Sequence, residues 1–166
     1  MSVYNNVVYR CSLSGIALSD AGEAPEHTVR RVKIMNNTLY GNGSRDWGGG
    51  ISVENPDVED LLIRNNIVSS SALFQIQVEV PVEGLEADHN LIDGYRGYED
   101  EIRGEHCLEG DPRFVDPEAG DFHLRPDSPA IDRGTAEDAP SVDLEGTPRP
   151  QGRGYDLGAY ELAGTP

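Results

Sequence analysis

Asparagine recurs in the same local context four times along the chain, and this repeat limits the fold more than any other feature. The recurring residues are Asn6, Asn37, Asn66 and Asn90, at spacings of 31, 29 and 24 residues. Short apolar segments flank them, as in VYNNVVY and IMNNTLY. A period of 20–50 residues made of short alternating segments predicts a β-solenoid, in which each repeat forms one coil.

Asparagine has a physical role in such a repeat. A sharp bend between two strands needs a residue that tolerates left-handed backbone geometry, and asparagine does. Stacked coils also bring the side-chain amides above one another, where they form a hydrogen-bonded ladder. We therefore expect an all-β fold: a right-handed, single-stranded parallel β-helix of about four coils over residues 1–107.

The repeat and the segment after it resemble the right-handed parallel β-helix proteins of the pectate-lyase-like superfamily. The repeat occupies residues 3–92, and the tail contains GDPRFVDPEAGDFHLRPDSPAIDRG and YDLGAYEL. This tail is similar to the C-terminal region of secreted β-helix proteins. The resemblance therefore implies an extracellular or cell-surface location.

Residues 108–166 are expected to form an irregular C-terminal cap that packs as part of the same domain. Two strand patterns, around Phe114–Val115 and Phe122–Leu124, flank an Asp-Pro/Gly turn. An open solenoid end exposes strand edges and apolar side chains, so a segment must cover it. The acidic residues expected to accept hydrogen bonds in the cap are Asp132, Asp143, Asp156 and Glu161.

Aligning the repeats on the asparagines predicts which side chains share a column. The inward column is Val3, Ile34, Ile63 and Ala87. One outward column contains Lys33, Leu62 and Glu86. Another contains Arg64 and Asp88, which are expected to form an exposed ion pair on adjacent coils. After the long loop, the outward column of Ala17, Ser52 and Gln77 forms a small, uncharged floor.

Two loop insertions mark a candidate binding site. The second coil has four extra residues within Gly41–Gly49, including the only tryptophan, and the first has a longer insertion within Ser19–Thr28. Insertions in solenoids gather on the binding face, and a sugar ring can stack on indole. The expected substrate-binding residues are Trp47, Arg45, Asp46, His27 and Gln77. Trp47 would serve equally well to cover the side of the solenoid.

Charge and motifs restrict the chemistry. With 13 basic and 30 acidic residues, the net charge of −17 disfavours nucleic acid as a partner. No apolar run is long enough for a membrane helix. Neither a Gly-x-Ser-x-Gly elbow nor an HExxH pair occurs, so no catalytic residue is assigned. Acidic clusters such as Asp57–Asp60 are candidates for calcium binding, although none has EF-hand spacing.

Three functions remain open. The first is a non-catalytic β-helix domain that binds an oligosaccharide or polysaccharide, as the C-terminal part of a larger or truncated secreted protein. The second, implied by the resemblance, is a polysaccharide lyase, or a fragment of one, that cleaves a uronate polymer by β-elimination. The third is a structural module that forms an end-to-end homodimer through the uncovered N-terminal coil, Met1–Tyr9.

Overall fold

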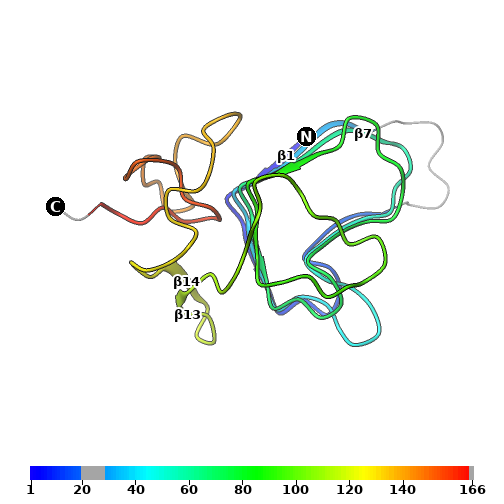
Figure 1. Ribbon diagram of the computed structural model, residues 1–166, viewed down its shortest axis with the longest axis horizontal. Helices are drawn as coiled ribbons and strands as arrows, with labels where there is room; N and C mark the ends of the chain where they lie inside the picture. Colours follow the sequence, from blue (N-terminus) through cyan, green and yellow to red (C-terminus); the bar gives the residue numbers. More distant parts are fainter. Residues whose placement is uncertain (20–28, 165–166) are drawn as a thin grey trace.

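The computed structural model describes residues 1–19 and 29–164, which form fourteen β-strands and no helix. Most of the strands belong to three parallel sheets (Figure 1). Sheet I contains β1 (Ser2–Tyr4), β4 (Val29–Met35), β7 (Val58–Arg64) and β10 (Glu86–Asp88). Sheet II contains β2 (Val7–Tyr9), β5 (Thr38–Tyr40), β8 (Ile67–Ser69), β11 (Leu91–Ile92) and β12 (Leu108–Glu109). Sheet III contains β3 (Ile16–Leu18), β6 (Ile51–Val53) and β9 (Ile76–Val78).

The chain visits the three sheets in turn, and each circuit stacks on the previous one (Figure 1). We call these circuits unit 1 (residues 2–18), unit 2 (29–53), unit 3 (58–78) and the shorter unit 4 (86–92). The predicted inward column is confirmed, because Val3, Ile34, Ile63 and Ala87 pair in register. The architecture is therefore all-β and β-helix-like, as the repeat predicted.

Apolar side chains from all three sheets fill the interior of units 2 and 3. Ile34, Leu39, Ile51 and Val53 have no exposed surface. Burial of each such side chain stabilises the fold by roughly 1.5–3 kcal/mol. The strands are short, so this stacked interior, rather than any single strand, holds the units together.

The predicted asparagine ladder lies at the corner between sheets I and II. The backbone N–H and Nδ2 of Asn6 donate to Oδ1 of Asn37 at 3.1 and 2.9 Å. The same pair of bonds links Asn37 to Asn66 at 3.0 Å each, and Asn66 to Asn90 at 2.9 Å each. The backbone N–H of Asn90 donates to the sulfur of Cys107 at 3.3 Å. Cys107 therefore occupies the next position of the ladder.

The left-handed bend lies one residue before each ladder asparagine, and not at the ladder residue as the sequence led us to expect. The φ angles of these residues lie between 48° and 58° at Asn5, Asn36, Asn65, His89 and His106. Asparagine is the non-glycine residue that best tolerates this region, and histidine is also enriched there. The Asn-Asn pairs therefore divide two roles: the first residue bends the chain, and the second directs its amide along the stack.

The C-terminal tail lies beside the units, so the expectation that it covers their end is wrong (Figure 1). Its two predicted strands are confirmed as the antiparallel pair β13 (Phe114–Asp116) and β14 (Asp121–Leu124). Phe122 packs against two tyrosines of sheet II. Its ring centroid lies 5.1 Å from that of Tyr9 and 5.4 Å from that of Tyr40. These aromatic contacts draw the tail onto the side of sheet II.

The bend asparagines hold the rest of the tail. Nδ2 of Asn5 donates to the carbonyl of Val142 at 2.8 Å. Asn65 and Thr135 exchange two bonds, of 2.8 and 3.0 Å. Asn36 donates to the carbonyl of Asp156 at 3.3 Å. Because each bend turns an amide outward, units 1–3 present a row of hydrogen-bonding groups that the tail satisfies.

Acidic side chains organise the tail internally, as predicted. Asp156 accepts hydrogen bonds from the backbone N–H groups of Asp132 and Leu162 at 2.8 and 2.7 Å. Burial raises the pKa of Asp156 to about 6. Glu161 binds Arg149 at 2.8 Å, and neither side chain has exposed surface. The tail therefore has a polar interior of its own beside a second apolar cluster, in which Phe114, Phe122 and Leu157 of the tail pack with Ile67 and Leu91 of sheet II.

We expect Asn66→Ala to destabilise the fold by roughly 1–3 kcal/mol, because the buried backbone N–H of Asn37 loses its acceptor, whereas Nδ2 of Asn37 keeps the carbonyls of Val3 and Met35. Asn6→Ala is the matched control, since Asn6 belongs to the same column but is exposed at its end. Its expected cost is below about 1 kcal/mol. Denaturant unfolding measures both, and equal losses would contradict a ladder that stabilises through its buried amides.

Candidate functional site

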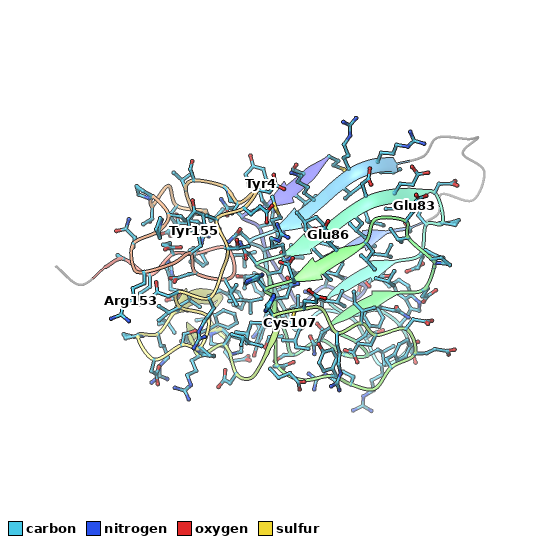
Figure 2. The ribbon with its side chains drawn as sticks, turned by 45° about the horizontal axis from the view of Figure 1, so that its top comes forward. Tyr4, Glu83, Glu86, Cys107, Arg153 and Tyr155 are labelled. Carbon is cyan, nitrogen blue, oxygen red and sulfur yellow. The ribbon has the colours of Figure 1, made fainter. Side chains whose placement is uncertain are left out.

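The outer face of sheet I carries a groove between the sheet and the tail. Its first hollow, of about 370 Å³, lies between Tyr4 and Lys33 of the sheet and Asp138 of the tail. A second hollow, of about 210 Å³, shares Lys33 and Asp138 with the first and continues to Asp60 and Glu86. The lining residues come from β1, β4, β7 and β10, so the groove crosses every strand of the sheet. Tyr4 lines the first hollow and Glu86 the second, and both are labelled in Figure 2.

Lys33 and Asp138 connect the two walls of the groove. Lys33 Nζ lies 2.6 Å from Asp138 Oδ1, and the side chains are 34% and 46% exposed. Such an exposed pair is worth less than about 1 kcal/mol, so a ligand hydroxyl can replace it at little cost. The charged side chains of the two hollows are Arg31, Lys33, Asp60, Glu86 and Asp138. The lining is therefore close to neutral, although the whole chain carries a charge of −17.

Tyr4 supplies an aromatic surface at one end of the groove. The residue is 50% exposed, and it pairs in register with Met35 on β4. Val142 of the tail lines the same hollow. A tyrosine ring with apolar neighbours and a nearby ion pair can bind a molecule that has both an apolar face and hydroxyl groups.

Arg64 and Asp88 form the predicted pair on adjacent strands, but they are not exposed as expected. Arg64 is only 6% exposed, and its guanidinium contacts Asp88 at 2.6 and 2.7 Å. Glu137 of the tail approaches the same guanidinium at 3.3 Å. The tail covers this corner, which explains why a pair expected on the surface is buried.

Hydrogen bonding favours the charged forms of Arg64 and Asp88. The bond to Asp88 raises the pKa of Arg64 above its ordinary value. Burial opposes the ionisation of Asp88, but hydrogen bonds from Arg64 and His89 outweigh it and lower the pKa of the Asp88 carboxyl. Both groups are charged at neutral pH. Asp88 therefore holds the Arg64 guanidinium in place, and Arg64 links sheet I to Glu137 of the tail.

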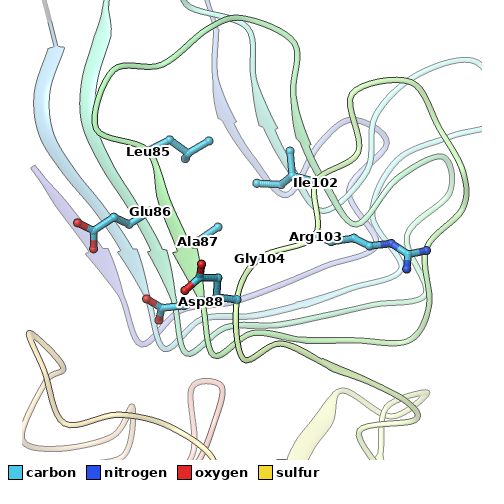
Figure 3. Close-up of a pocket in the computed structure, with 8 residues that line it drawn as sticks. Leu85, Glu86, Ala87, Asp88, Ile102, Arg103 and Gly104 are labelled. Atoms are coloured by element: carbon cyan, nitrogen blue, oxygen red, sulfur yellow. The ribbon is translucent and has the colours of Figure 1, made fainter.

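A third hollow, of about 480 Å³, opens beyond β10 at the end of the stack (Figure 3). Leu85, Ala87 and Ile102 line its apolar part. Glu86 is shared with the groove and, in Figure 3, points away from this apolar side. At β10, the last strand of sheet I, the groove therefore adjoins this apolar hollow through Glu86.

Two other hollows contain reactive or charged side chains that already interact with other residues of the protein. In one, of about 470 Å³, the rings of His89 and His106 stack with centroids 5.2 Å apart beside Cys107. Burial raises the pKa of the Cys107 thiol, so the reactive thiolate is disfavoured. In the other, of about 510 Å³ beside sheet II, Arg113 is paired with Asp127 at 3.0 Å.

The residues expected to bind substrate are distributed over separate parts of the molecule. Arg45 and Asp46 are exposed and Trp47 is half-buried, on a loop whose Gly48 lies against the backbone of Leu13 in unit 1. Gln77 lies in the next unit, on β9. His27 falls outside the described residues. A binding role for these residues stays a prediction.

The floor predicted around Gln77 is not open. Ala17, Ser52 and Gln77 pair in register as expected, but Ser52 and Gln77 are buried. Gln77 Nε2 donates to Glu79 at 2.9 Å and to the carbonyl of Glu99 at 3.3 Å. The chain beyond unit 4 folds back here and covers Gln77, whereas Ala17 at the other end of the column is exposed.

Metal and membrane sites were sought in the part of the chain that the structure describes. Within residues 1–19 and 29–164, no group of three or more His, Cys, Asp or Glu side chains is placed to hold a metal ion. Over the same ranges, no helix is long and apolar enough to span a bilayer. Calcium binding by the acidic clusters stays a prediction.

Stacked parallel sheets with a groove across one outer face define a β-helix-like repeat protein. A family model described as disaggregatase related matches residues 1–98, which is more than half of the chain, and the chain belongs to this family. No curated protein matches the chain, and no solved structure does. The match includes every strand of sheet I but not the tail that forms the other wall of the groove.

Sequence reasoning placed Lys33 and Glu86 correctly in one outward column, which the register of sheet I confirms. It did not identify the groove, because Asp138 is more than 100 residues away from Lys33 along the chain. The column of outward polar residues was the available signal. What was missing was the position of the tail.

We expect Arg64→Ala to destabilise the protein by roughly 3 kcal/mol, because Asp88 keeps its charge in a mostly buried position with only the hydrogen bond to His89 left. Arg30→Ala is the control on the same sheet, since Arg30 and Glu59 are an exposed pair, and its cost should be below about 1 kcal/mol. Chemical denaturation compares the two variants. Similar losses for both would show that the tail does not bury Arg64.

Proposed function

We propose that this protein binds a polysaccharide along the groove on sheet I. The observation that carries the proposal is the pair of adjoining hollows across β1, β4, β7 and β10, which share Lys33 and Asp138 and have Tyr4 at one end. Four strands spaced about 4.8 Å apart extend over roughly 14 Å, which suits an extended oligosaccharide segment better than a single small molecule. The ligand runs along the stack of units, across the strands.

The lining favours an uncharged or weakly charged sugar chain. Arg31 and Lys33 balance most of the charge of the three carboxylates in the groove. Lys33 donates to sugar hydroxyl oxygens, and Asp60, Glu86 and Asp138 accept hydrogen bonds from hydroxyl groups. Tyr4 stacks on the apolar face of a ring. A polymer with a high negative charge would meet the strongly acidic surface that surrounds the groove.

The fold and the family support the same proposal. We propose in addition that the stacked units form a right-handed, single-stranded parallel β-helix of about four coils, similar to those of the pectate-lyase-like superfamily. The family description refers to a disaggregatase, and a domain that holds a polymer would serve an activity that separates aggregates. Fold alone does not assign function, so the proposal rests on the groove.

The test is binding of the full chain to a panel of neutral polysaccharides and to pectate and alginate, each with and without calcium. We expect Tyr4→Ala to weaken binding of the preferred polymer about tenfold, or about 1.4 kcal/mol, through lost ring stacking. Lys33→Ala should weaken it several-fold. Affinity electrophoresis or calorimetry measures both.

Trp47→Ala and Arg45→Ala are the matched controls, because they remove an aromatic and a cationic side chain at the site predicted from loop insertions. They should bind as the wild type does. Loss of binding in these variants, with Tyr4→Ala unchanged, would move the site to the insertion within Gly41–Gly49. Release of an unsaturated product in the same mixtures would identify a lyase instead of a binding domain.

A further inference from the structure

The row of bend residues continues beyond unit 3 as two histidines. His89 and His106 have the same left-handed backbone as the asparagines at the first three bends, with φ of 48° and 52°. Those asparagines bind the tail directly, whereas at the histidines a hollow of about 470 Å³ opens between the stack and the tail. Residues 132–134 of the tail line its other side. A ligand in this hollow would therefore touch both the stack and the tail.

The two imidazole rings supply hydrogen-bonding nitrogens on the stack side of the hollow. Their centroids lie 5.2 Å apart, and Nδ1 of His89 lies 2.9 Å from Oδ1 of Asp88. Asp88 is ionised at neutral pH, so this oxygen only accepts hydrogen bonds. Nδ1 of His89 therefore carries a proton, and Nε2 becomes a donor only when the ring is protonated. A protonated His89 thus has one N–H left for a ligand.

The guanidinium of Arg133 adds a permanent positive charge on the tail side of the hollow. Within residues 1–19 and 29–164 it forms no ion pair, whereas Arg10, Arg113 and Arg149 are each paired with a carboxylate. Guanidinium N–H groups match the oxygens of phosphate and carboxylate groups in geometry and charge. In a chain with a net charge of −17, an arginine without a carboxylate partner at a hollow indicates an anionic ligand.

The acidic and thiol groups beside the hollow are already engaged or uncharged. Asp88 is held by Arg64, whose guanidinium contacts it at 2.6 and 2.7 Å. Oδ1 of Asp132 accepts a backbone N–H of the tail at 2.9 Å. Burial raises the pKa of the Cys107 thiol and keeps it uncharged. Glu105, which pairs with Asp88 across the end of sheet I, is exposed, so solvent and salt screen its charge. Protonation of the two rings therefore makes the hollow positive.

We propose that this hollow binds a small tetrahedral oxyanion, phosphate or sulfate, as the free ion or as a monoester. Arg133 donates to it from the tail, and the protonated rings of His89 and His106 donate from the stack. Donors on two facing walls suit a tetrahedral ion, whose oxygens point in different directions. Two stacked imidazolium rings repel each other, so the anion favours their protonation and their protonation favours its binding. The ion holds the tail to the stack, as the asparagine amides do at the first three bends.

The test is a titration of the full chain with sodium sulfate at constant ionic strength, followed by the NMR signals of the ring C–H groups of His89 and His106. Histidine gains its proton between pH 8 and pH 5, whereas sulfate keeps its charge over that range. We expect saturable shifts of both rings and a dissociation constant at least fivefold lower at pH 5.5 than at pH 8. Inorganic phosphate and a sugar phosphate are the further probes. Tighter binding of the sugar phosphate would identify an ester as the ligand, and equal or weaker binding would identify the free ion.

Four variants test the donors. Arg133→Ala should weaken sulfate binding at least fivefold, and so should His89→Asn and His106→Asn, which keep a residue that the other bends already use. Arg153→Ala is the matched control, because it removes an exposed arginine from a part of the tail away from Cys107 and the hollow (Figure 2). It should bind sulfate as the wild type does. Absence of saturable shifts in the wild type, or equal weakening by Arg133→Ala and Arg153→Ala, would overturn the proposal.

Discussion

The hydrogen-bonded amides of Asn37, Asn66 and Asn90 set the register on which the rest of the structure depends. Each is fully buried, so a displaced amide would leave donors without partners, at about 1–3 kcal/mol per group. A shift of one residue would also turn the inward columns of the strands toward solvent. The ladder and the apolar columns therefore favour the same alignment, and each supports the other.

The tail depends on that alignment in turn. The ladder fixes where the preceding bends occur, and the bends turn Asn5, Asn36 and Asn65 outward to bind tail carbonyls. The tail then follows the side of the stack, buries Arg64 and brings Asp138 to Lys33. The groove on sheet I is thus a product of two parts of the chain, and neither forms it alone.

The sequence predicted the units well because the relevant signals are local and repeated. Asparagine spacing and apolar alternation predicted the register of Ile34, Ile63 and Ala87. The tail has no repeat, so its strands could be predicted from nearby residues, whereas its position could not. Two errors follow from this: the cap and the exposed Arg64–Asp88 pair. The floor at Gln77 was also expected to be open, but it is covered by the chain beyond unit 4, which has no repeat either. Because three of the repeats contain two consecutive asparagines, the sequence also did not show which of the two makes the bend.

Native-state hydrogen exchange tests the central role of the ladder most directly. The backbone amides of Asn37 and Asn66 each donate to the side chain of the next ladder residue. We predict that they are among the slowest in the protein and exchange only on global unfolding. Exchange of these amides as fast as those of the exposed residues Arg45 and Asp46 would contradict the account.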